Sequence, residues 1–391
     1  MHQPATDPRP RVLHLAQPVD AGVARVVLDL TRAQLASGLH VTVACPAGGS
    51  LADGARALGA DVRRWEATRS PGPRLVSEVR RLARVVAEVR PDLVHAHSAK
   101  AGLAGRLAVR GRIPTVFQPH AWSFEAVGGV TATLATGWER WGARWATRTV
   151  CVSEAERTTG LRAGVRSRWS VIPNGIDTER FHPAAVDTVR AGIEQLAGVG
   201  PAAPLVVCVG RLCRQKGQDV LLNAWDEVVR RVPKARLVLV GDGPDRAALR
   251  QLAPDSVLFA GAVDDAVPWY QAADLVVLPS RWEGMALAPL EAMACGRPVV
   301  VTDVAGARES LPPGLAPRCL VPAQNPAVLS GAIAELLLDP LLRESLGHQG
   351  RRYVQSTHDV RHSAEAVAEV YRDLLGGKPV VPTECRESIH S

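Results

Sequence analysis

The sequence predicts two doubly wound α/β domains in tandem. Short apolar runs alternate with longer segments whose apolar residues recur with helical spacing, and this alternation occurs twice along the 391 residues. Strands that are apolar on both faces and separated by helices are typical of parallel sheets covered on both sides. A chain of this length is also too long for one ordinary domain, so two domains of about 180 residues are expected.

Each half of the chain contains six expected strands. In the N-terminal half they are residues 11–16, 40–45, 92–97, 115–118, 149–153 and 170–173. Helical patterns lie between them, at residues 24–37, 74–90, 101–110, 133–146 and 154–162. In the C-terminal half the strands are residues 205–210, 236–241, 257–259, 275–279, 298–302 and 318–321. Open α/β sheets bind ligands at the carboxyl ends of their strands, so functional residues are expected directly after strands, facing a cleft between the domains.

Composition shifts divide the chain into five parts, with a Gly-, Pro- and Ala-rich connection ending near residue 204. In chain order, the expected parts are a flexible start at 1–10, a Rossmann-like domain at 11–182, a second Rossmann-like domain at 204–356, an amphipathic helix at 357–376 that returns to the first domain, and a flexible tail at 377–391.

The composition argues against several classes of protein. No run of 18 or more apolar residues exists, so no membrane-spanning helix is expected. The polar start MHQPATDPRPR lacks the apolar core of a signal peptide. The seven cysteines are scattered without a CxxC pair, which favours neither a metal site nor a disulfide framework. We therefore expect a cytoplasmic protein.

The net charge of +7 is unevenly distributed. Up to residue 180 there are 25 Lys and Arg against 15 Asp and Glu, whereas the remainder has 21 against 24. A genome that favours Arg codons would explain why only four of the 46 basic residues are Lys, but not the difference between the halves. The first half is expected to meet an anionic partner.

Two cations follow the first strand of the second domain. Arg211 and Lys216 lie on a glycine-bounded loop between that strand and a helix. Cations that converge with a helix N-terminus suit a diphosphate, although a solvated basic loop is the alternative. Farther along, the strand near 257–259 leads into a turn at Val263 whose backbone could face a flat base.

Two glutamates flank the start of a helix after the strand at 275–279. Glu283 lies in the loop before the helix and Glu291 lies on it, eight residues later. Two carboxylates in these positions can hydrogen-bond two separate polyols. The backbone N–H groups of Met285, Ala286 and Leu287 can meet negative oxygens between them.

From about residue 11 to 376 the sequence resembles the retaining GT-B glycosyltransferases of family 4. Its Glu283 and Glu291 match the family's Glu-x7-Glu pair, and the loop from Gly210 to Gly217 matches its phosphate-binding segment. Residues 171–177, VIPNGID, match the segment near the family's domain crossover. The resemblance implies that the first domain binds the acceptor and the second binds a nucleotide-sugar.

The resemblance also implies roles for individual residues. Glu291 would bind the ribose, and Glu283 would bind the donor sugar with help from the amides of residues 285–287. Arg211 and Lys216 would hold the diphosphate and stabilise the leaving group, so that neither a metal nor another cofactor is needed. In the first domain, His120 matches a histidine that approaches the reacting carbon of the sugar.

Other matches in the first domain are less complete. The family usually has two adjacent glycines after the first strand, where the backbone approaches the donor or acceptor, and this chain has only Gly22. Ser98, Lys100 and Trp122 also follow strands and are candidates for acceptor binding, with an ordinary helix cap as the alternative for Ser98.

Two segments of the first domain could contact an anionic membrane. The expected helix at 74–90 interleaves five arginines with apolar residues. The tryptophans Trp138, Trp141 and Trp145 share one helix face, and we expect them to pack into the domain instead. Nucleic acid is not expected as a partner, because no recognition motif or aromatic platform appears.

The expected protein is thus a retaining, metal-independent hexosyltransferase. We expect it to use a UDP-sugar and a lipid-linked or phospholipid-like glycan acceptor, and to be peripheral at the inner face of the membrane. GDP-mannose as donor, or an antibiotic aglycone or cyclitol as acceptor, are the alternatives. Sugar-nucleotide epimerases, phosphorylases and non-catalytic sugar-nucleotide-binding proteins share the architecture, but the Arg211, Lys216 and Glu-x7-Glu combination argues against them.

Overall fold

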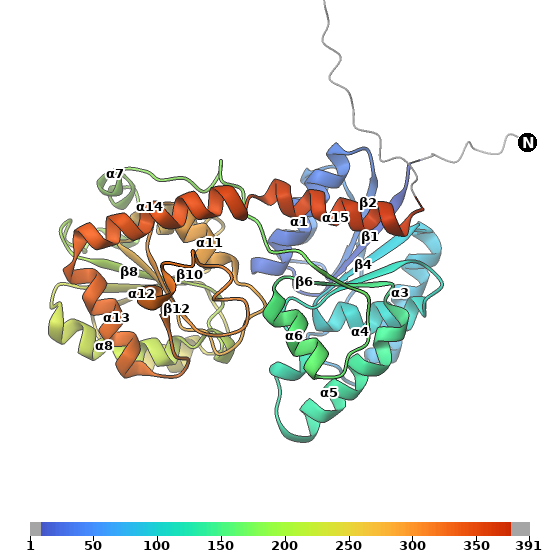
Figure 1. Ribbon diagram of the computed structural model, residues 1–391, viewed down its shortest axis with the longest axis horizontal. Coiled ribbons are helices and arrows are strands. Elements are labelled where there is room, and N and C mark those ends of the chain that lie inside the picture. Colours follow the sequence, from blue (N-terminus) through green and yellow to red (C-terminus); the bar gives the residue numbers. More distant parts are fainter. Residues whose placement is uncertain (1–8, 377–391) are drawn as a thin grey trace, which may run out of the picture. The chain divides into compact units, whose positions relative to one another are not determined.

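The computed structural model describes residues 9–376, which form two compact units (Figure 1). The N-terminal unit contains residues 9–151, 157–172 and 364–376, and the C-terminal unit contains residues 152–156 and 173–363. The ends expected to be flexible lie outside the described residues, apart from residues 9 and 10.

A seven-stranded parallel sheet forms the centre of the N-terminal unit. Its strands are β1 (Arg11–Ala16), β2 (His40–Cys45), β3 (Asp61–Arg64), β4 (Leu93–His97), β5 (Thr115–Gln118), β6 (Arg148–Cys151) and β7 (Trp169–Val171). The spatial order is β3-β2-β1-β4-β5-β6-β7, so the order reverses between β1 and β4. This reversal is the topological switch point at which such sheets bind ligands.

Six helices connect these strands, and a seventh returns from the C-terminus. They are α1 (Ala21–Ala36), α2 (Ser50–Ala57), α3 (Leu75–Val89), α4 (Ser98–Val109), α5 (Gly129–Gly142), α6 (Glu154–Arg162) and α15 (Val360–Leu374). From α15, the side chains of Val367, Val370 and Tyr371 complete the core between α1 and the sheet.

The C-terminal unit repeats the design with six parallel strands. They are β8 (Leu205–Val209), β9 (Arg236–Val240), β10 (Val257–Gly261), β11 (Leu275–Leu278), β12 (Val299–Thr302) and β13 (Leu320–Val321). Their order is β10-β9-β8-β11-β12-β13, which places the switch point between β8 and β11. Both units therefore confirm the predicted doubly wound α/β class.

Eight helices belong wholly to the C-terminal unit. They are α7 (Val186–Ala191), α8 (Gln218–Arg231), α9 (Arg246–Leu252), α10 (Val267–Ala272), α11 (Leu287–Ala294), α12 (Ala316–Cys319), α13 (Pro326–Leu338) and α14 (Pro340–Thr357). Within residues 9–376, no helix combines the length and hydrophobicity needed to cross a bilayer.

The structure differs from the sequence-based expectation at one sheet edge and at the unit boundary. Strand β3 was not expected, because its sequence DVRR is polar and largely exposed at the edge. Residues from Pro173 onward group with the C-terminal unit, whereas the expected first domain extended to residue 182. The physical reason is local pairing: Ile176 forms a parallel bridge with Asp359 at the start of α15.

Candidate active site

Three of the residues expected to bind a donor, Arg211, Lys216 and Glu283, lie at the switch point of the C-terminal unit. Strands β8 and β11 are parallel neighbours, with Val206 opposite Leu275. The loop with Arg211 and Lys216 follows β8, and the loop with Glu283 follows β11. Since parallel neighbours end at the same edge of a sheet, both loops meet there.

The Lys216 ammonium pairs directly with the Glu283 carboxylate. Lys216 Nζ lies 2.6 Å from Glu283 Oε1, and the lysine and glutamate side chains are 20% and 9% exposed. The same oxygen accepts a hydrogen bond from the Ser280 hydroxyl at 2.8 Å. Because both bonds use Oε1, Oε2 of Glu283 stays available as an acceptor for a hydroxyl group.

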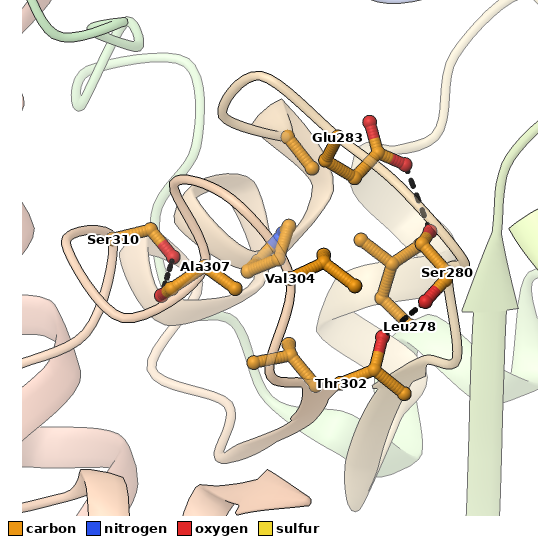
Figure 2. A pocket seen from close by; sticks show the side chains of 10 residues that line it. Leu278, Ser280, Glu283, Thr302, Val304, Ala307 and Ser310 are labelled. Carbon is orange, nitrogen blue, oxygen red and sulfur yellow. Dashed lines mark hydrogen bonds between the residues drawn. The ribbon is translucent and has the colours of Figure 1, made fainter. Parts of the chain in front are cut away.

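A second hydrogen bond holds the Ser280 segment in place (Figure 2). The Thr302 hydroxyl, at the end of β12, donates to the Ser280 carbonyl at 2.5 Å. Ser280, Glu283 and Thr302 line a small pocket together with Leu278 and Val304. The Glu283 side chain is therefore positioned by two strands rather than by its own loop alone.

The Arg211 guanidinium is half-buried at the end of β8. Among residues 9–376 no side chain forms a hydrogen bond or ion pair with it. The surrounding loop is closely packed, because a Cβ at Gly241 or Gly243 would meet the carbonyl of Gly210 or Leu212 at 2.2 Å. This close approach fixes the loop and leaves its arginine free to meet an anion.

An ion pair that sequence reasoning missed joins the loop after β11 to the first turn of α8. Arg281 binds Asp219 of α8 through two hydrogen bonds, of 2.8 and 2.6 Å. The Gln215 side chain donates to the Trp282 carbonyl at 3.1 Å. Asp219 has a lowered pKa, chiefly because of the hydrogen bond from Arg281. An Arg and an Asp that are 62 residues apart carry no sequence signal of their pairing.

Two distant segments hold the backbone before α11. The Asn174 side chain donates to the Met285 carbonyl at 2.8 Å, and the Ser153 hydroxyl donates to the Gly284 carbonyl at 3.1 Å. Asn174 belongs to the VIPNGID segment, and Ser153 follows β6. Ala286 precedes the helix and Leu287 begins it, so the N–H groups of this turn lack intrahelical acceptors.

Glu291 is anchored by a buried tyrosine of α10. The Tyr270 hydroxyl donates to Glu291 Oε2 at 2.6 Å. Burial raises the pKa of Tyr270 well above its ordinary value, and the neighbouring Glu291 carboxylate adds to this effect. Val263 lies in the loop between β10 and α10. The structure thus places every expected donor-binding residue of this unit at the carboxyl ends of β8, β10 and β11.

In the N-terminal unit, the half-buried His120 ends a row that continues through two buried histidines. Its Nε2 lies 3.2 Å from His97 Nδ1, and His97 Nε2 lies 2.9 Å from His14 Nδ1. His120 follows β5 and has a φ of 58°, a left-handed conformation that is uncommon outside glycine. His14 and His97 were not expected as site residues. The sequence indicates them only by their positions on two strands, because histidines on adjacent parallel strands can face the same side of a sheet.

The other two strand ends at this switch point also carry left-handed residues. Ala21, directly before Gly22, has a φ of 61°, and Ser98 has a φ of 67°. Ala21 thus adopts a conformation suited to glycine, at the place where the family usually has two adjacent glycines and this chain has only Gly22. His97 is the cap residue of α4, and Ser98 is the first residue of that helix. No side-chain cap hydrogen bond is formed at this helix start.

The two remaining acceptor candidates are buried. Lys100 Nζ lies 2.6 Å from Glu78 Oε2, and both side chains are almost fully buried. Its ammonium also donates to the Ser70 carbonyl at 3.2 Å. Burial raises the pKa of Glu78, but hydrogen bonds from Lys100 and Thr68 outweigh it and the net pKa is lowered. Trp122 packs inside the core at 1% exposure.

The two segments considered for membrane contact differ in exposure. On α3, Glu78, Leu82 and Val85 are buried, whereas the arginines of this helix and its flanks are exposed. The Trp138, Trp141 and Trp145 rings contact one another, and Trp141 is 43% exposed. The tryptophan stripe is therefore only partly covered by the unit.

Two doubly wound units in tandem, with seven and six parallel strands, are the architecture of GT-B glycosyltransferase structures. HepE from Anabaena, solved with UDP-glucose, has this fold, with a TM-score of 0.80 and 24% identity over 93% of this chain and 99% of HepE. The model for Glycosyltransferase Family 4 matches residues 21–180, and the model for Glycosyl transferases group 1 matches residues 203–339. The chain belongs to the glycosyltransferases of family 4, also called group 1.

Related sequences carry several glycosyltransferase names. An alpha-maltose-1-phosphate synthase from Mycobacterium tuberculosis is 30% identical over 78% of this chain and 86% of its own length. A GDP-mannose-dependent monoacylated alpha-(1-6)-phosphatidylinositol monomannoside mannosyltransferase from Corynebacterium glutamicum is 34% identical over 55% of this chain. The match spans only 58% of the length of the latter relative.

Proposed function

We propose that the chain transfers a hexose from a nucleoside diphosphate donor to an acceptor hydroxyl, with retention at the anomeric carbon. The observation that carries this proposal is the Lys216–Glu283 pair at the switch point, with Arg211 on the same loop as Lys216 and Glu291 on the following helix. A diphosphate needs cations, and a sugar needs hydroxyl acceptors. This site offers both within one sheet edge.

In the proposed reaction, the bond between the anomeric carbon and the diphosphate oxygen breaks. The acceptor oxygen bonds to the same face of that carbon, and its proton moves to the departing diphosphate. Lys216 and Arg211 neutralise the charge that develops on the leaving group, which makes a metal unnecessary. Glu283 and Glu291 bind hydroxyls of the sugar and ribose.

The donor is proposed to be a UDP-sugar, with GDP-mannose as the second candidate. The names of the Corynebacterium relative and of a second mannosyltransferase, from Mycolicibacterium smegmatis, support GDP-mannose, while the HepE complex with UDP-glucose illustrates the first choice. A thermal-shift screen with UDP, GDP, dTDP and ADP separates them, because a bound nucleotide raises the melting temperature by mass action. If no nucleotide raises it, the proposed donor site is wrong.

Transfer itself is tested by release of nucleoside diphosphate with and without an acceptor. Acceptor-dependent release supports a transferase. Release without an acceptor supports a sugar-nucleotide epimerase, and binding without release supports a non-catalytic sugar-nucleotide-binding protein. NMR of the product reports the anomeric configuration. An inverted product would contradict the retaining mechanism.

The acceptor is proposed to be lipid-linked or phospholipid-like, with α3 as a contact to an anionic membrane. Arg80, Arg81 and Arg84 are exposed on this helix, and Val76 is 60% exposed. The double substitution Arg80→Glu and Arg84→Glu should weaken sedimentation with vesicles that contain phosphatidylglycerol. The exposed Arg352 of α14 is a matched control, since its reversal should leave vesicle binding unchanged.

A further inference from the structure

A continuous chain of side-chain hydrogen bonds runs from the interior of the N-terminal unit to His120. It starts at Gln34 of α1, whose Oε1 lies 2.8 Å from His14 Nε2. From His14 it continues through His97 to His120, with nitrogen–nitrogen distances of 2.9 and 3.2 Å. Gln34, His14 and His97 are buried, so water does not compete for these bonds.

The anchor at Gln34 determines where the protons lie. Its Nε2 donates to the Tyr371 hydroxyl at 3.4 Å, and its Oε1 can only accept. His14 must therefore carry a proton on Nε2, which makes its Nδ1 an acceptor when the ring is neutral. The same logic repeats along the chain: His97 donates from Nε2 to His14, and His120 donates from Nε2 to His97.

The three histidines of this hydrogen-bonded chain, His14, His97 and His120, are neutral at physiological pH. Burial lowers the pKa of His14 to about 4, although the bond with Gln34 opposes the shift. Burial also lowers the pKa of His120 to about 3. For His97, burial and the adjacent histidines hold the pKa well below its ordinary value. A neutral imidazole has one donor and one acceptor, so each ring passes the same orientation to the next.

We propose that Gln34, His14 and His97 are positioning residues that fix His120 as the Nε2–H tautomer. His120 Nδ1 is then a lone-pair acceptor directed to a hydroxyl donor, which on the proposed function is a sugar hydroxyl. The proposal rests on that function only for the identity of the hydroxyl. The tautomer itself is a property of the protein without substrate.

A metal ion is the competing account of the same histidines. His14, His95 and His97 offer ring nitrogens within 4.8 Å of one another. However, the His95 and His97 rings are stacked, with centroids 4.0 Å apart, rather than converging on a point. The short contact between His14 and His97 is also accounted for by a shared hydrogen.

The tautomer is measurable by NMR of full-length protein labelled with ¹⁵N-histidine, without substrate. In the unsubstituted protein, His120 should show a protonated Nε2 and an unprotonated Nδ1. Tyr371→Phe frees the Gln34 amide to turn, and Gln34→Met removes the anchor at similar volume. Both variants should convert His120 to a mixture of tautomers. His120→Gln identifies the His120 signals.

His358→Phe is the matched control. His358 is also buried, but its Nδ1 bonds to the Asn174 carbonyl in the C-terminal unit, so it is not part of the chain to His120. This variant should leave the His120 tautomer unchanged. A protonated Nδ1 in the unsubstituted protein, an unchanged tautomer in both Gln34→Met and Tyr371→Phe, or one equivalent of zinc bound to His14, His95 and His97 overturns the proposal.

Kinetics give a second readout. Losing one hydrogen bond from His120 to the reacting sugar should lower kcat for Gln34→Met by up to about tenfold, with little change in donor KM. If the tautomer behaves as expected but no transfer occurs with any donor, the proposed function fails and the positioning chain stands. If transfer occurs but the His120 tautomer does not respond to Gln34→Met and Tyr371→Phe, the proposed function stands and the positioning chain fails.

Discussion

The Lys216 ammonium lies 2.6 Å from the Glu283 carboxylate, so the residue proposed for phosphate is already paired with the residue proposed for the sugar. A bound donor would place its diphosphate and its sugar on either side of this pair. The pair keeps both side chains in position before the donor arrives, at sites fixed by β8 and β11.

Lys216→Ala should therefore lower transfer by about 10²- to 10³-fold, because it removes a cation from the leaving group. The loss should appear in kcat as well as in donor KM. Lys234 is an exposed lysine before β9, and Lys234→Ala is the control that should keep full activity. A Lys216→Ala protein with an unchanged rate for every donor would show that the diphosphate lies elsewhere.

Glu291→Ala should weaken binding of the nucleoside diphosphate by about ten- to 100-fold, since it removes a charged hydrogen-bond acceptor from the ribose. Calorimetric titration with the nucleotide from the thermal screen measures this. Glu335→Ala, at an exposed glutamate of α13, should bind as the unsubstituted protein does. Equal affinity of the two variants would remove Glu291 from the donor site.

Lys100→Met should lower the free energy of unfolding by about 3–5 kcal/mol, because it leaves Glu78 buried and unpaired. Adding Glu78→Leu should recover most of that loss, which denaturant unfolding can measure. Transfer by the double variant then tests the acceptor role of Lys100. Normal acceptor KM would mean that Lys100 is structural, and a selective rise in acceptor KM would support the predicted role.

The buried histidines should make the protein sensitive to acid. Their pKa values are lowered in the folded state, to about 4 for His14 and about 3 for His120, against about 6.5 when unfolded. The unfolded chain thus binds more protons below pH 6.5. Stability is complete above that pH and falls as the pH drops, by about 1.4 kcal/mol per pH unit for each such histidine.

Unfolding measured between pH 6.5 and 5 checks this slope before most carboxylates titrate. His95→Phe should reduce the slope by one proton, because burial also lowers the pKa of His95. The same slope in both proteins would mean that His95 is protonated in the folded state.

Ala21→Gly should raise the free energy of unfolding by up to about 1 kcal/mol, because glycine relieves the left-handed conformation at φ 61°. Ala21 is exposed, so no packing is lost. Ala33→Gly, inside α1, should instead destabilise by about 1 kcal/mol. Melting temperatures that shift in the same direction would contradict this account of Ala21.

Much of the fold was predictable because buried parallel strands are continuous apolar runs. Strand β3 was not predicted, because an edge strand needs no apolar pattern, as its Arg63 and Arg64 illustrate. The proposed donor-site residues were singled out by their places after strands. Their contacts were not, since the bond from Tyr270 to Glu291 and the pairing of Arg281 with Asp219 depend on tertiary packing.

The contacts between the histidines also could not be predicted from the sequence. His14 and His97 lie within strands whose neighbours are apolar, so they resemble ordinary core positions. Only the parallel register of β1 and β4, which sets His14 opposite His95 and Ala16 opposite His97, brings them together. Lys100 was an acceptor candidate from its place after β4, and sequence could not reveal its partner Glu78, 22 residues earlier on α3.

The return of α15 to the N-terminal unit has a consequence for biosynthesis. Val367, Val370 and Tyr371 complete the core of the unit that the ribosome makes first, and they are among the last described residues of the chain. Until α15 has been synthesised, after nearly all of the C-terminal unit, the core of the N-terminal unit lacks these three side chains. Domains usually fold in the order of synthesis, but here the first domain begun is the last to be finished.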